Sequence, residues 1–99
     1  METVIDINPR DKEILFYLLA WYLPNTTVWA HGSRVTGNSK PWSDLDLVVF
    51  TEEKDKYKLS LLKEAFEESN LSFRVELLEW NRLPKNFKSN IAASHAVIA

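Results

Sequence analysis

Two aspartates, Asp44 and Asp46, open the segment with the strongest strand signal of the chain, DLDLVVFT over residues 44–51. Alternate residues of a strand point to the same face, so both carboxylates would project together, with Cα atoms roughly 6.5–7 Å apart. Carboxylate oxygens at that spacing suit Mg²⁺ or Mn²⁺ and can serve one ion or a pair of ions in phosphoryl transfer. A D-x-D pattern by itself, however, is more typical of a strand that starts in water.

A second chemical signal, separated from Asp44 by ten residues, is Gly32-Ser33, which follows a short apolar stretch. Gly32 and Gly37 are the only glycines of the chain, and both fall within this one turn. Glycine lets a backbone approach a phosphate closely, and free N–H groups at the start of a helical turn attract anions. Ser33 adds a small hydroxyl donor, so the turn is a candidate phosphate-binding site.

The elements that would position these residues can be read from periodicity. Asn8-Pro9 is typical of a helix start, and Pro24-Asn25 of a helix end. β-Branched and aromatic residues predict strands, and a charged face opposite an apolar one predicts a helix. The pattern gives strands over 26–31, 44–51 and 73–80, a helix over 53–69, and a last short helix that begins near Pro84. The expected fold class is α/β (α+β), a small three-stranded mixed sheet with flanking helices.

Composition limits the function classes. The 99 residues predict a single domain over residues 1–99, and the net charge of −2 disfavours a general nucleic-acid binder. Cysteine is absent, which excludes disulfides and thiolate chemistry. No segment has the pattern of a signal peptide or of a membrane span, so we expect a cytoplasmic protein without a membrane partner.

The joined pattern resembles a known family. The segments V-W-A-x-G-S-R-V-x-G, S-D-L-D-L, L-K-E-A-F-E-E-S-N-L and F-R-V-E-L-L-E-W cover most of the chain. Together they resemble the DNA polymerase β-type nucleotidyltransferases. The small size is similar to the minimal branch of that superfamily, whose members are partnered with HEPN-domain toxins in toxin–antitoxin pairs.

The resemblance implies roles for individual residues. Gly32 and Ser33 would hold the triphosphate, while Asp44 and Asp46 would bind metal. A third catalytic and metal-binding carboxylate would come from a following strand, where this chain has Glu76 in place of the usual aspartate. The fallback, Glu79, would lie on the opposite face of the strand because of its odd offset.

Three further residues near the turn have open roles. Arg34 could bind the nucleotide, and so could Lys40, although a solvated loop charge is nearly as plausible for the lysine. His31 is either a packed strand residue or a group near the phosphates. The four tryptophans, including Trp42 beside the acids, suggest more apolar surface than one small chain buries.

The resulting functional hypothesis is a nucleotidyltransferase. The resemblance implies transfer of AMP from ATP, or of another NMP from its NTP, with Mg²⁺ or Mn²⁺, to a hydroxyl such as a tyrosine of a partner HEPN toxin. The chain would thereby act as an antitoxin, in a hetero-oligomer or as a homodimer. A long nucleic-acid template is not expected, because no second domain exists to bind it. The alternative is a catalytically weak or silent subunit that neutralises its partner by contact.

Overall fold

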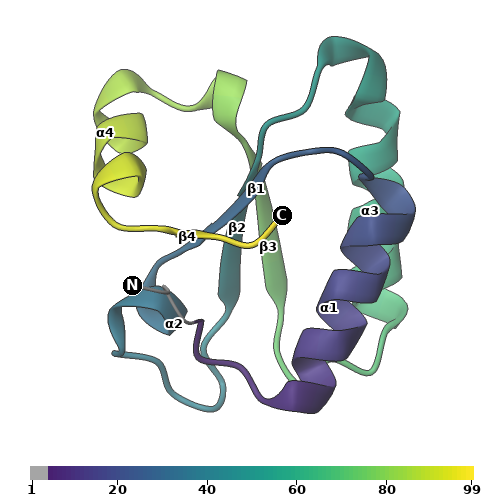
Figure 1. Cartoon of the computed structure of the whole chain (residues 1–99), viewed down its shortest axis with the longest axis vertical. Coiled ribbons are helices and arrows are strands. Elements are labelled where there is room, and N and C mark those ends of the chain that lie inside the picture. The colour runs from purple at the N-terminus through teal and green to yellow at the C-terminus, as the bar shows by residue number, and fades with distance from the viewer. Residues whose placement is uncertain (1–4) are drawn as a thin grey trace.

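The computed structural model of the protein describes residues 5–99 as a sheet with helices on both sides (Figure 1). The helices are α1 (Pro9–Tyr22), α2 (Ser33–Thr36), α3 (Lys56–Glu68) and α4 (Lys85–Ala93), with short 3-10 turns at Glu53–Asp55 and Trp80–Arg82. The strands are β1 (Val28–His31), β2 (Leu45–Val49), β3 (Val75–Glu79) and β4 (Ala96–Val97). The predicted strands and longer helices are all present, with ends shifted by a few residues.

Helix α1 begins at the predicted cap. The Asn8 side chain accepts a hydrogen bond from the Asp11 N–H at 2.8 Å, and its amide donates to the Asp11 carboxylate at 2.8 Å. Asp11 is fully buried and also accepts hydrogen bonds from the N–H and hydroxyl of Ser72. This acid therefore joins the start of α1 to the loop before β3 and is fully engaged in that structural role.

The sheet has the strand order β3-β2-β1-β4. Strand β1 is antiparallel to both β2 and β4, whereas β2 and β3 are parallel and are joined through α3. The sheet is mixed, as predicted, but it has four strands instead of three. The additional strand, β4, is only two residues long, which is too short for an alternating pattern to reveal; it forms because Ala96 and Val97 lie beside Ala30 and Trp29.

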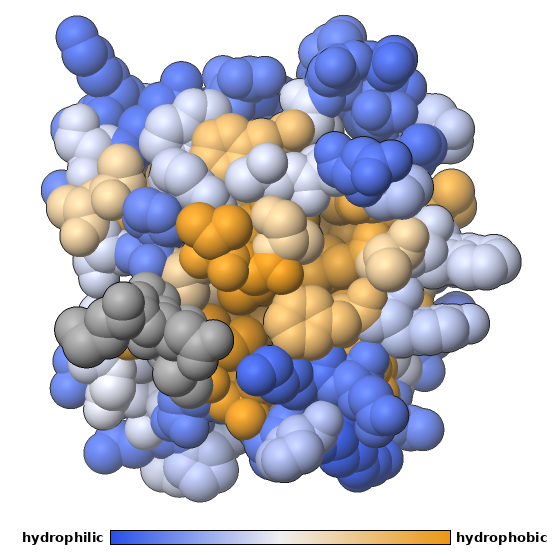
Figure 2. Space-filling model, in the orientation of Figure 1, coloured by the Kyte–Doolittle hydropathy of each residue, from blue (hydrophilic) through white to orange (hydrophobic). Residues whose placement is uncertain are grey.

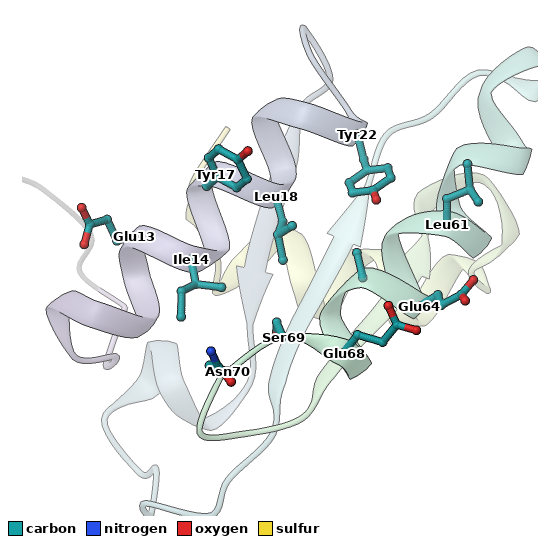
Figure 3. Close-up of a pocket in the computed structure, with 11 residues that line it drawn as sticks. Glu13, Ile14, Tyr17, Leu18, Tyr22, Leu61, Glu64, Glu68, Ser69 and Asn70 are labelled. Atoms are coloured by element: carbon teal, nitrogen blue, oxygen red, sulfur yellow. The ribbon is translucent and has the colours of Figure 1, made fainter.

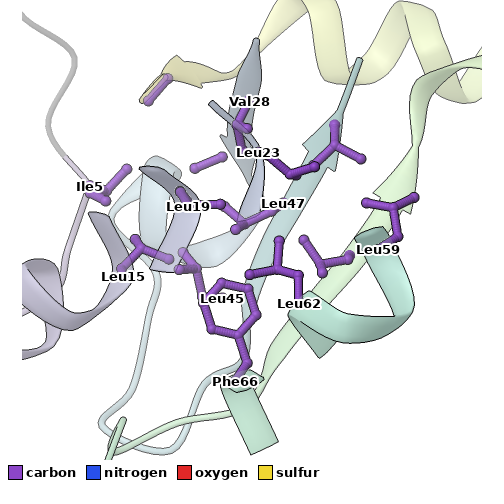
Figure 4. Packing of buried hydrophobic residues seen from close by; sticks show 14 residues of the cluster. Ile5, Leu15, Leu19, Leu23, Val28, Leu45, Leu47, Leu59, Leu62 and Phe66 are labelled. Atoms are coloured by element: carbon purple, nitrogen blue, oxygen red, sulfur yellow. The ribbon is translucent and has the colours of Figure 1, made fainter. Parts of the chain in front are cut away.

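The core lies between the sheet and the pair α1 and α3. Alternate residues of β2, namely Leu45, Leu47 and Val49, are fully buried and point toward these helices. Figure 4 shows Leu45 and Leu47 among leucines of both helices. The labelled residues of this cluster are Ile5, Leu15, Leu19, Leu23, Val28, Leu45, Leu47, Leu59, Leu62 and Phe66. The remaining residues of β2 therefore face the other side of the sheet, where α4 lies (Figure 1).

That second face is divided into two halves. At one end the rings of Trp29, Phe50 and Trp80 pack edge-on or tilted, with centroids 4.6 to 5.4 Å apart, and His95 stacks on Trp29 at 3.8 Å. Strand alternation places His31, Asp46 and Glu76 on the same face, toward the other end. The aromatic cluster closes one half of the face, so the polar residues are confined to the other.

The surface view in the same orientation shows apolar side chains gathered over β4, between α1 and α4, with polar residues around them (Figure 2). Val97 of β4 is 64% exposed. Across residues 5–99, no helix is both long and apolar enough to cross a membrane.

Candidate active site

The turn after β1 brings a backbone against a carboxylate. Gly32 has φ 81° and ψ −158°, a conformation that residues with a side chain rarely adopt, and it starts the short helix α2. A Cβ atom built on Gly32 would lie 2.5 Å from Oδ2 of Asp46. Glycine is therefore required here twice, for its backbone conformation and for the space that Asp46 occupies.

The remainder of the turn is a single tight helical turn. The N–H groups of Val35 and Thr36 both donate to the carbonyl of Gly32, at 3.0 and 3.1 Å. Gly37 then ends α2 in the left-handed conformation. The first N–H groups of a helix have no partner inside it, so Ser33, the first residue of α2, is where the sequence places a phosphate.

Three strands contribute one polar residue each at the same level of the sheet. Asp46 on β2 lies directly opposite His31 on β1 and Glu76 on β3. Asp44 immediately precedes β2 and, by alternation, lies on the same face. The structure thus lines up all three predicted acids, Asp44, Asp46 and Glu76, along one face, next to the Gly32 turn. We call Asp44, Asp46 and Glu76 the acid row.

Electrostatics in the acid row favour a cation. Burial raises the pKa of Asp46 above its usual range, the negative charges of Glu76 and Asp44 raise it further, and the neighbouring His31 partly offsets this. A carboxylate whose ionised form is opposed by burial and by two like charges is stabilised by any cation that neutralises it. The donors are all carboxylate oxygens, which is the chemistry Mg²⁺ and Mn²⁺ prefer.

The side chains of the acid row offer suitable donor atoms, but they are not arranged as a formed metal site. Within the part of the chain that the structure describes, no three His, Cys, Asp or Glu side chains are gathered tightly enough to form a metal site. The three carboxylates share a face, and Asp46 and Glu76 also share a level, but the side chains would have to converge by rotation to hold one ion. The metal ligand set Asp44, Asp46 and Glu76 remains a prediction that the donor chemistry fits.

His31 lies between the turn and the acid row. Its Nε2 atom is buried and has no hydrogen-bond partner among the described residues. Burial lowers the pKa of His31 below its usual value of 6.5, although the charges of Asp46 and Glu76 pull it upward. Its ring packs edge-on against the ring of Phe87 of α4, with the two ring centroids 6.4 Å apart. His31 is therefore packed into the wall of the site.

Arg34 has a different position from the one expected of a nucleotide-binding residue. The side chain is 6% exposed, and its guanidinium donates to the carbonyls of Ser43 (2.8 and 3.0 Å) and Asp6 (2.7 Å). The group also stacks over the ring of Phe73, 4.3 Å from its centroid. These contacts engage the whole guanidinium, so Arg34 holds the loop 37–44 that leads into Asp44. Gly32 and Ser33 remain the predicted nucleotide-binding residues.

Glu79, the fallback third acid, pairs with Arg82 at 3.4 Å and sits beyond Leu78, on the opposite face from Glu76.

Lys40 and Trp42 are exposed on the loop held by Arg34, and Trp42 is 76% exposed. A hollow of about 1070 Å³ is lined by Trp42, Asp44 and Glu76 together with residues of α3 and β3. Space for a substrate therefore adjoins the acid row.

Another groove, of about 760 Å³, lies between α1 and α3 (Figure 3). Its lining is apolar in the middle, with Ile14, Leu18 and Leu61, and carries Glu64 and Glu68 from α3. The helices that form it cover the core face of the sheet, so this groove is separated from the acid row by the sheet. We place the chemistry at the acid row because only there do a glycine turn and several acids from neighbouring strands meet.

Comparison with known proteins decides the family. The family described as "Polymerase beta, Nucleotidyltransferase" matches residues 22–99. The chain belongs to that family. Over 95 residues it is 42% identical to the Haemophilus influenzae protein named "Probable protein adenylyltransferase MntA", an alignment that spans 95% of this chain and 83% of MntA. The predicted nucleotidyltransferase class and its minimal type are thus confirmed.

A solved structure described as "Crystal structure of the toxin-antitoxin with AMP-PNP" has the same fold. Its TM-score is 0.65 with 16% sequence identity, and the match covers 87% of this nucleotidyltransferase and 70% of that chain. At this identity the likeness concerns the fold, and it agrees with the predicted polymerase β-like arrangement of a mixed sheet with flanking helices.

The sequence did not reveal two features of the site. One is the set of hydrogen bonds by which Arg34 holds loop 37–44, which we call the Arg34 clamp. Its acceptors are main-chain carbonyls, which no residue pattern encodes. The other is the level of His31 beside Asp46, which depends on the register between β1 and β2. A histidine directly before Gly32 was the available signal, but it could not show which strand residue would lie opposite.

Proposed function

We propose that this nucleotidyltransferase transfers AMP from ATP to a hydroxyl group of a partner protein, and that the transfer makes it an antitoxin. The observation that carries the proposal is the meeting of the Gly32 backbone with the Asp46 carboxylate, with Glu76 level with Asp46 on the next strand. The contact supports a phosphate-binding role for the Gly32 turn and a metal-binding role for the acids beside it. The name of MntA supports adenylyl transfer to protein, and the AMP-PNP in the name of the fold neighbour supports ATP.

The reaction needs no covalent intermediate on the enzyme. The acceptor hydroxyl oxygen forms a bond to the α-phosphorus, the bond from that phosphorus to the oxygen bridging to the β-phosphate breaks, and pyrophosphate leaves. The hydroxyl proton would pass to a carboxylate of the acid row, and we assign this role to Glu76, which is exposed at the edge of the row. Bound Mg²⁺ would supply charge neutralisation for the phosphates; Asp44, Asp46 and Glu76 would hold it.

The chain contributes positioning by its own residues. The backbone of Gly32 and the hydroxyl of Ser33 would orient the phosphates at the start of α2. Arg34 fixes the loop that carries Asp44, and the aromatic cluster around Trp29 limits the open part of the face to the acid end. By resemblance to the minimal branch, the acceptor is a tyrosine of a HEPN toxin.

A second candidate function is neutralisation by contact alone. It is favoured by the lack of a tightly gathered metal site in residues 5–99 and by the exposure of Tyr17, Trp21 and Tyr57, each at least 65% exposed. Such aromatic surface is common where proteins bind each other. The longer side chain of Glu76 in place of aspartate also points this way, because misplacement by about 1 Å can cost two orders of magnitude in rate.

One experiment separates the two. The chain is purified with whatever protein co-purifies, and ATP labelled at the α-phosphate is added with Mg²⁺. Transfer of label to the co-purifying protein, lost in Asp44→Asn and retained in Glu68→Gln on the distant face of α3, supports the enzyme. A partner that is inhibited equally by wild type and Asp44→Asn, without label, would establish the contact mechanism instead.

A further inference from the structure

Strand β3 is an open edge of the sheet that leads into the acid row. Among residues 5–99 it pairs with β2 alone, and it stands at one end of the strand order. The Leu45 N–H donates to the Arg74 carbonyl at 2.8 Å, with Leu45 level with Val75. In a parallel ladder with that register, residues 74, 76 and 78 turn their backbone groups to β2. Val75, Leu77 and Glu79 therefore direct theirs to the open side.

A groove follows this edge. The hollow of about 1070 Å³ beside the acid row is continued by one of about 480 Å³, and both are lined by Lys63, Leu77 and Leu78. Leu77 and Leu78 belong to opposite faces of β3, so the space lies along the edge of the strand and not over one face. The groove begins at Trp42, Asp44 and Glu76 and runs toward Arg82 and Leu83.

We infer that this edge is where the acceptor binds, as an extended segment of the partner protein that adds to the sheet beside β3. The inference rests on the proposed function and names the form in which its substrate is held. An exposed edge with free backbone groups recruits extended peptides by main-chain hydrogen bonds, and alternate side chains provide specificity. The segment must come from a terminus or loop, because its own N–H and C=O groups have to be free.

The register explains why such a segment would be an acceptor. Neighbouring strands lie about 4.8 Å apart, and residues at the same level on one face are neighbours. A tyrosine opposite Glu76 would stand on the face of the acid row, with Glu76 as its direct neighbour and Asp46 one strand further on. The residues before and after it would point to the other face, toward the α3 side of the groove, where Phe66, Leu71 and Phe73 line it.

Charge in the groove adds a preference. Lys63 is exposed on α3 and lines both hollows, and Glu67 of the same helix lines the larger one. At the far end, Lys56 and Arg82 already pair with Glu53 and Glu79. A segment with an acidic residue next to its tyrosine would meet Lys63 from the α3 side. We expect acidic flanking residues to favour transfer and Lys63→Glu to reverse that preference.

The test uses the full chain, Mg²⁺, ATP labelled at the α-phosphate, and synthetic peptides with a central tyrosine flanked by glutamate or lysine. Methylating single backbone nitrogens of a labelled peptide removes one N–H at a time. Pairing along β3 predicts an alternating result: methylation at one set of alternate residues reduces labelling at least tenfold, and methylation at the other set leaves it within about twofold. The set that is sensitive also reveals whether the segment runs parallel or antiparallel.

Location is tested by amide hydrogen exchange with the same peptide. Slower exchange at Leu77 and Glu79, without change at β4, is expected. Labelling that ignores backbone methylation, or protection confined to β4, would overturn the edge inference while leaving AMP transfer intact. A chain that binds ATP but labels no peptide also overturns it, because an open edge needs no folded partner. Loss of ATP binding itself would count against the proposed function.

Discussion

Gly32 is the residue at which the phosphate turn and the acids come together. Alanine there would place its Cβ 2.5 Å from the Asp46 carboxylate and would force φ 81° on a residue with a side chain. We expect Gly32→Ala to cost about 1–3 kcal/mol in the free energy of unfolding and to reduce AMP transfer by about 100-fold or more, because Asp46 must move. Urea unfolding and the labelled-ATP assay measure the two effects.

Gly37 supplies the matched control. It has a similar φ of 85°, but a Cβ there would meet nothing within 4 Å. Gly37→Ala should therefore show the backbone cost, about 1 kcal/mol, without the large loss of transfer. Equal losses of transfer in the two variants would show that the contact between Gly32 and Asp46 has no part in the activity.

His31 is expected to lower the stability of the protein. Its Nε2 is buried without a partner among the described residues, so His31→Phe should raise the free energy of unfolding at pH 7 by about 1 kcal/mol. The pKa of His31 is lowered in the folded state, so the unfolded chain binds more protons between that lowered pKa and 6.5. Stability should thus rise with pH through this window in the wild type. Urea titrations at several pH values should show that the free energy of unfolding rises less steeply with pH in His31→Phe than in the wild type. The same slope in both proteins would contradict this role of His31.

At the scale of elements, Arg34 fixes the path of loop 37–44 between α2 and β2. Arg34→Lys keeps a positive charge but replaces a planar fork that serves several main-chain carbonyls with a single ammonium. We expect a loss of about 2–3 kcal/mol in the free energy of unfolding, because the part-buried hydrogen bonds to the carbonyls of Ser43 and Asp6 lose their donors. The exposed Arg82→Lys should stay within about 0.5 kcal/mol. Equal urea midpoints for both variants would refute the clamp.

The elements show what a sequence of this kind reveals and what it conceals. The cap Asn8-Pro9 and the apolar run after Asp44 predicted α1 and β2 because each has a local signature. Strand β4 has none, since two residues cannot alternate, and its pairing with Trp29 and Ala30 is fixed by tertiary packing. The common face of Asp44, Asp46 and Glu76 was predictable from spacing and resemblance. The role of Arg34 was not, because main-chain acceptors distant in sequence determine it.

At the scale of the whole molecule, substrate binding should stabilise the fold. The acid row carries unfavourable charge in the free protein, so Mg²⁺ with a non-hydrolysable ATP analogue should raise the melting temperature; at 100 times Kd the gain is about 2.7 kcal/mol. Chelation of the metal should reverse the shift. Protons compete with the metal, so the shift should fall as the pH drops through the raised pKa of Asp46. Thermal scans of Asp46→Asn should show little shift, whereas Glu68→Gln should behave as wild type.

The most direct test of nucleotidyl transfer compares ATP labelled at the α-phosphate with ATP labelled at the γ-phosphate. The chain, its co-purifying protein and Mg²⁺ are mixed with each, and both the protein-bound label and the released pyrophosphate are measured. The acid row and the Gly32 turn predict label on protein from the α-position alone, with one pyrophosphate released for each AMP attached. Label from the γ-position, or attachment that is unchanged in Asp46→Asn, would contradict this assignment.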